Sequence, residues 1–118
     1  MGKLYYGNAI EPVEMPDRTL AHVKTLITTK LRRSESFSLS WDRVVDGEVQ
    51  RSGIWLQSSI PLRFELSAEA ATKLDMAYLQ QLAQAANSSA GVIIDLCEAP
   101  IETEVQTIPR ISELGRAA

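Results

Sequence analysis

The side chains that most often carry catalysis are few in this chain and lie far apart. One histidine, His22, and one cysteine, Cys97, are separated by seventy-five positions. The carboxylates do not cluster at the spacing of metal ligands, and Asp17 and Asp75 are explained as helix N-caps. We expect His22 to be solvated on the polar side of a helix. The composition therefore predicts a non-catalytic protein with no cofactor and no metal site.

Cations gather on one predicted helix, which begins near Asp17. Arg18, Lys30, Arg32 and Arg33 lie on or beside the face opposite its apolar stripe. Residues 17–63 carry eight Lys and Arg against five Asp and Glu, whereas residues 64–118 carry three against eight. A basic face can bind phosphate groups, and the alternative is a solvated helix surface whose last cations oppose the helix dipole. Nucleic acid is therefore one candidate partner.

Trp55 is the second candidate for a binding contact. Alternation separates it from Ile54 and Leu56, so Trp55 shares the other face of the sheet with polar side chains. The expected companions on that face are Ser38, Ser40, Arg63 and Glu65. An indole in such surroundings can stack on a base, a sugar or a side chain of a partner. The alternative is a register shifted by one residue, which places Trp55 in the core. We favour burial against a second subunit.

The strand pattern predicts the fold class. Residues 36–42 alternate small polar and large apolar side chains, which is typical of a strand with one buried face. Asp46-Gly47 predicts a tight turn into a partner strand over residues 48–57, and residues 62–66 alternate again. We expect these three strands to form an antiparallel meander.

Further elements lie on either side of this meander. Gly7-Asn8 predicts an N-terminal hairpin, and residues 92–96 predict a final buried strand. The apolar stripe of the first helix is Leu20, Val23, Ile27 and Leu31, and that of a second helix is Tyr78, Leu79, Leu82 and Ala86. The predicted class is α+β: a largely antiparallel sheet (N-terminal hairpin, central three-stranded meander, C-terminal strand) with two helices on one face.

The length of 118 residues suits one hydrophobic core. We expect a single domain over residues 1–96 and a tail over residues 97–118 that packs on the body or on a neighbouring subunit. An apolar run such as Gly91-Val92-Ile93-Ile94 is far too short to span a membrane. A cytoplasmic, soluble protein with no membrane partner is the expectation, and the residues point to no particular small-molecule ligand.

Several stretches of residues 1–96 resemble a family of small actinobacterial proteins of unknown function. The stretches are Met1–Gly7, Asp17–His22, Lys30–Phe37, Ser40-Trp41, Ile54–Leu56, Ile60–Phe64 and Ala86–Gly91. Members are often labelled ATP-dependent DNA ligase, so the resemblance implies that name and no set of active-site residues. A ligase of this type takes the adenylate on the lysine of a Lys-x-Asp-Gly motif. The nearest match, Lys73-Leu74-Asp75-Met76, lacks the glycine.

These features lead to three hypotheses of function. The first is a non-catalytic, homo-oligomeric interaction module. The second is a nucleic-acid-binding accessory protein linked to DNA ligation or repair, which would use Arg18, Lys30, Arg32, Arg33 and Trp55. The third is a ligase-related protein, which rests on the family label alone.

Overall fold

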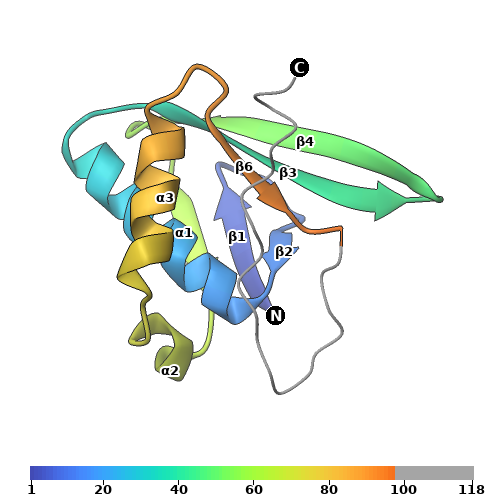
Figure 1. The fold of residues 1–118 in the computed structure, drawn as a ribbon, viewed down its shortest axis with the longest axis horizontal. Coiled ribbons are helices and arrows are strands. Elements are labelled where there is room, and N and C mark those ends of the chain that lie inside the picture. Colours follow the sequence, from blue (N-terminus) through green and yellow to red (C-terminus); the bar gives the residue numbers. More distant parts are fainter. Residues whose placement is uncertain (98–118) are drawn as a thin grey trace.

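The computed structural model of the protein describes residues 1–97, in which six strands and three helices form an α+β fold (Figure 1). The strands make two separate three-stranded sheets that are mostly antiparallel. The α+β class is confirmed. The tail predicted over residues 97–118 lies outside the described part of the chain, except for Cys97.

The first sheet has the strand order β2-β1-β5. Its strands are β1 (Gly2–Tyr6), β2 (Val13–Met15) and β5 (Leu62–Glu65). Both pairings are antiparallel, and β1 with β2 forms the N-terminal hairpin that the sequence predicts. Gly7 at φ +64° supports the turn after β1, because glycine adopts positive φ without steric cost.

The second sheet has the order β4-β3-β6, with β3 (Phe37–Val45) in the centre. β4 (Glu48–Leu56) pairs antiparallel with β3 over nine residue pairs, and the Asp46-Gly47 turn between them has positive φ at both residues. This is the type of turn that matches the twist of a hairpin. β6 (Val92–Asp95) is almost fully buried, as the sequence predicts, and runs parallel to β3.

The expected meander is wrong in its third strand. β5 pairs with β1 of the first sheet instead of with β4. The N–H of Gly7 also donates to the carbonyl of Pro61, 2.8 Å away, which extends this association beyond the strand. Alternation along β5 specifies which of its faces packs on the core. This part of the prediction is confirmed, because Leu62 and Phe64 are half-buried against the core whereas Arg63 and Glu65 are exposed. It does not specify the neighbouring strand, because any open edge offers the same backbone donors and acceptors.

Two longer helices cover the core. α1 (Asp17–Arg32) packs on β1 and on α3 (Met76–Ala86), and α3 also contacts β3 and β6 (Figure 1). A short helix that the sequence did not predict, α2 (Ala68–Ala71), packs against α1. The predicted stripes are buried, apart from Leu31 and Leu79 at their margins. No helix in residues 1–97 has the length and apolar character needed to cross a bilayer.

The two helices begin differently from each other. Asp75 is the N-cap of α3, as predicted, and its side chain accepts hydrogen bonds from the N–H groups of Ala77 and Tyr78. Asp17 is not an N-cap, because the cap position of α1 is Pro16 and no side chain caps it. Asp17 is the first helical residue, where its negative charge faces the positive end of the helix dipole.

His22 is fully buried, which corrects the expectation of a solvated histidine. The N–H of Asp75 donates to its Nε2 at 2.8 Å, so this nitrogen carries no proton. Nδ1 lies 2.7 Å from the carbonyl oxygen of Arg18 and is therefore the protonated donor. The ring also meets Tyr78 edge-on, with 5.2 Å between centroids. A neutral His22 thus ties α1 to the start of α3.

Replacement of His22 by phenylalanine should lower the free energy of unfolding by about 1–3 kcal/mol, because the half-buried N–H of Asp75 loses its acceptor. Urea denaturation measures this loss. Thr29→Ala, at an exposed position of the same helix, is the control and should change stability by at most about 0.5 kcal/mol. Equal stability of the two variants would contradict the linking role of His22.

Candidate interaction surface

The longest open edge lies along β4. Among the described strands only β3 pairs with it. Because the turn has two residues, Val45 and Glu48 form a hydrogen-bonded pair. Starting with Val49, every second residue of β4 therefore directs its N–H and C=O away from β3. These residues are Val49, Arg51, Gly53 and Trp55. The contact of Trp55 fits this geometry, because its carbonyl accepts a hydrogen bond from the hydroxyl of Tyr6 in the first sheet.

The side chains of the same residues lie on the face of the β3–β4 ribbon that points away from the core. We call this the outer face; it consists of Ser38, Ser40, Asp42, Val44, Val49, Arg51, Gly53 and Trp55. Trp55 is 57% exposed beside Ser38, and Val49 is 58% exposed opposite Val44. The register expected for Trp55 is therefore confirmed, together with its companions Ser38 and Ser40. Arg63 and Glu65 do not share this face, because β5 belongs to the other sheet.

The middle of the outer face is flat, because its residues are small. Gly53 stands opposite Ser40, and a Cβ atom at Gly53 would lie only 2.7 Å from the Ser40 hydroxyl oxygen. A larger side chain at this position would have to displace Ser40. The indole of Trp55 thus stands next to a shallow floor, which is a shape that can receive a side chain of another molecule.

A charged pair joins the two strands further along the ribbon. Nε and Nη2 of Arg51 donate to the two carboxylate oxygens of Asp42 at 2.7 and 3.0 Å. Asp42 is only 2% exposed, and its carboxylate, as acceptor of the side-chain hydrogen bond, raises the pKa of Arg51. Charge-assisted bidentate pairs of this kind are strong and directional. Beyond the pair, β6 no longer accompanies β3, so the ribbon continues as an arm with Val44, Val45 and Val49 exposed (Figure 1).

The four predicted cationic residues are not brought together. Lys30 is buried, and its ammonium group contacts Oδ1 of Asn87 at 2.7 Å and Oε1 of Glu35 at 2.9 Å. Arg18 is half-buried, whereas Arg32 and Arg33 are exposed. Fourteen residues of helix place Arg18 about 21 Å from Arg32 along the axis. Arg32 and Arg33 precede the start of β3, the end of the ribbon at which Trp55 pairs with Ser38.

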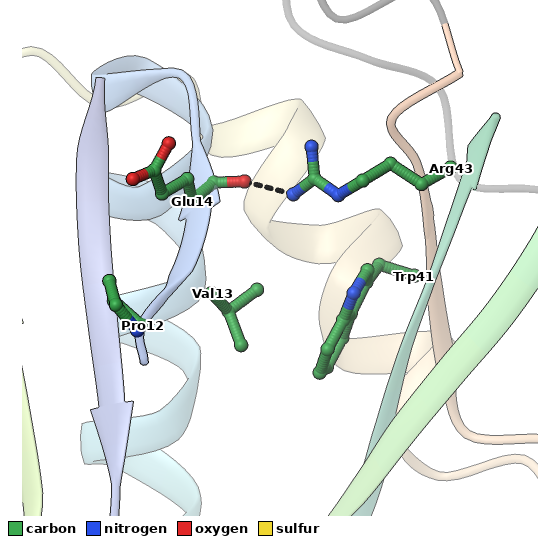
Figure 2. Close-up of a pocket in the computed structure, with 5 residues that line it drawn as sticks. All are labelled: Pro12, Val13, Glu14, Trp41 and Arg43. Carbon is green, nitrogen blue, oxygen red and sulfur yellow. Dashed lines mark hydrogen bonds between the residues drawn. The ribbon is translucent and has the colours of Figure 1, made fainter. Parts of the chain in front are cut away.

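A groove separates β2 of the first sheet from β3 of the second (Figure 2). Its volume is about 330 Å³, and its lining residues are Pro12, Val13, Glu14, Trp41 and Arg43. The guanidinium group of Arg43 donates to the backbone carbonyl of Glu14 and so bridges the two sheets. The indole of Trp41 forms the wall opposite Val13 (Figure 2).

The described residues contain no cluster of three His, Cys, Asp or Glu side chains that could hold a metal ion. The ligase-like stretch has structural contacts instead. Nζ of Lys73 pairs with Glu69 at 2.8 Å on the surface, and Asp75 caps α3.

Comparison with known proteins places the chain in a family. A model of the domain of unknown function DUF7882 matches residues 1–96. The chain belongs to the DUF7882 family. The match ends one residue after β6, so the DUF7882 domain contains every strand and helix described above. No curated protein matches the chain, and no solved structure matches it. The family of unknown function and its extent, which the resemblance implied, are confirmed.

The contact of Lys30 with Glu35 predicts a pH-dependent contribution to stability. The hydrogen bond from Lys30 is the main cause that lowers the pKa of Glu35 below its ordinary value. A carboxyl group with a lower pKa in the folded state stabilises the fold above its unfolded pKa, and the contribution is lost as the pH falls through the folded pKa. Glu35→Gln should therefore be less stable than the wild type at pH 7. The difference should shrink as the pH falls below the ordinary pKa of a glutamate, about 4.3, and disappear once the folded carboxyl group is protonated.

Urea denaturation at pH 7, 5 and 3 measures this difference. Glu11→Gln, in the exposed loop between β1 and β2, is the matched control and should follow the wild type at each pH. A stability difference for Glu35→Gln that stays constant down to pH 3 would show that the ion pair is not its cause.

Proposed function

We propose that the protein is a non-catalytic interaction module that forms a homodimer through β4 and the outer face. The observation that carries this proposal is that, within residues 1–97, the nine-residue strand β4 pairs with β3 alone and bears exposed Trp55 and Val49. A long edge strand of this kind favours pairing with another strand. Its exposed residues include few of the charges that usually prevent such pairing.

A second copy of β4 fits this edge, since an antiparallel pair can form across a two-fold axis from the same strand in both subunits. An axis at Ser52 sets Arg51 of one copy opposite Gly53 of the other, where there is room for its side chain. The same axis sets Val49 opposite Trp55, and aromatic pairs with β-branched residues stabilise sheets. An axis at Arg51 would instead oppose two guanidinium groups.

Substitution of Val49 or Trp55 by lysine should convert the dimer to a monomer, because each change places a charge in the apolar part of the interface. Size-exclusion chromatography with light scattering measures the mass. Ile10→Lys is the control, since Ile10 is 89% exposed in the loop after β1 and lies outside β4 and the outer face. A wild type that is monomeric at high concentration would overturn the proposal.

Two further variants separate strand pairing from packing between faces. Val49→Pro removes an N–H that points away from β3, so it blocks an added strand and leaves the β3–β4 ladder intact. Ser52→Cys in a Cys97→Ser chain should form a disulfide-linked dimer on oxidation, whereas Gln50→Cys should not. A Val49→Pro protein that remains dimeric, or crosslinking at residue 50 instead of 52, would exclude this register.

Nucleic acid is the alternative partner, and the exposure of Arg32 and Arg33 near the Trp55 end of the ribbon is the observation that favours it. The ligase label of the resembling family points to the same class of partner. Titration of short DNA at increasing salt tests it. A protein that acts only by self-association should show no binding at about 50 mM salt. Salt-dependent binding that Arg32→Glu and Arg33→Glu abolish would favour the alternative.

A further inference from the structure

The groove between the two sheets is a surface within the fold, lined by both apolar and polar groups, that the proposed dimer does not use. Trp41, Pro12 and Val13 are half-buried and supply its apolar walls. Trp41 also packs against the hydrophobic core, so the groove is continuous with the interior. In Figure 2 the carboxylate of Glu14 points away from the groove, whereas the guanidinium group of Arg43 lies at its rim. The groove therefore presents an apolar wall and a cation.

The described chain ends beside this groove. β6 runs parallel to β3 up to the pair of Asp95 with Asp42, which lies between Trp41 and Arg43 in the sequence of β3. The N–H of Leu96 then donates to the carbonyl of Asp42 at 2.9 Å. The N–H of Cys97 donates to the side chain of Asp95 at 3.0 Å, which begins a turn. A few further residues, each spanning up to about 3.3 Å, are enough to reach Trp41.

The segment after Cys97 has the chemistry that complements the groove. Pro100 and Ile101 are its first large apolar residues, and Glu98 and Glu102 flank them. An apolar pair between two carboxylates matches an indole wall with an arginine at its rim. A tethered segment of the same chain also binds at a high effective concentration, so that a modest contact is enough to hold it.

We propose that this segment docks in the groove of its own chain, with Pro100 and Ile101 on Trp41 and Val13 and a flanking glutamate beside Arg43. Docking would cover the half-buried side chains of Trp41 and Val13 between the two sheets. It would also link the end of β6 to β2, which belong to different sheets. The site is separate from the β4 edge, so the two proposals can fail independently.

The experiment uses the full chain and the two indole N–H signals in its nitrogen-15 NMR spectrum. Ile101→Asp should shift the Trp41 signal toward that of a solvated indole and leave the Trp55 signal unchanged. Ile111→Asp, a matched change further along the chain, is the control and should shift neither signal. An unchanged Trp41 signal in the Ile101→Asp protein would overturn the proposal.

Backbone relaxation provides a second measurement that does not depend on the folding of one variant. Order parameters of residues 99–103 should be near 0.8 in the wild type and fall below about 0.6 in Arg43→Glu. Combining Arg43→Glu with Glu98→Arg and Glu102→Arg should restore them. Low order parameters in the wild type would refute docking. A Trp41 signal that changes with protein concentration in the Val49→Pro chain, in which the β4 dimer cannot form, would place the segment on a second copy and would also refute docking.

Discussion

The structure depends on the alternation of side chains along β3. This strand is central in its sheet, so its backbone is held by β4 on one side and β6 on the other. Phe37 and Leu39 enter the core, whereas Ser38 and Ser40 face outwards. Because a shift by one residue would exchange the two faces, the burial of Phe37 and Leu39 also determines that Trp55 is exposed.

The same strand connects the two surfaces for which we propose functions. Trp41 is on the core side of β3 and lines the groove, while Asp42, the next residue, is on the other side and holds Arg51. Asp42 and Arg51 form a charged, bidentate pair in which the carboxylate is buried. The pair joins β4 to β3 at the point where β6 ends. Beyond this point the hairpin pairing and the contact of Arg43 with the carbonyl of Glu14 support the arm. The docking that we propose for the following segment therefore depends on where β6 stops.

Much of the local structure could be predicted from particular residues. Asp46-Gly47 specifies a hairpin turn, Asp75 specifies the start of α3, and the stripe of α1 specifies its buried face. The candidate surface was predicted in part, since the exposure of Trp55 follows from alternation. The groove was not predicted, because its walls come from β2 and β3, which belong to different sheets and do not pair. The buried positions of His22 and Lys30 were also missed, since their partners Asp75 and Asn87 lie more than fifty residues away.

The sequence by itself determined the α+β class, both hairpins, the two longer helices and the face of the ribbon that carries Trp55. These features arise from contacts between neighbouring residues and from periodicity, which the chain encodes locally. Only the tertiary structure decided that β5 joins β1, that β6 lies parallel to β3 and that His22 is buried beneath α3. These features depend on which strand edges and polar groups still lack hydrogen-bond partners when the chain collapses. Because buried polar groups must form hydrogen bonds, few arrangements provide partners for all of them.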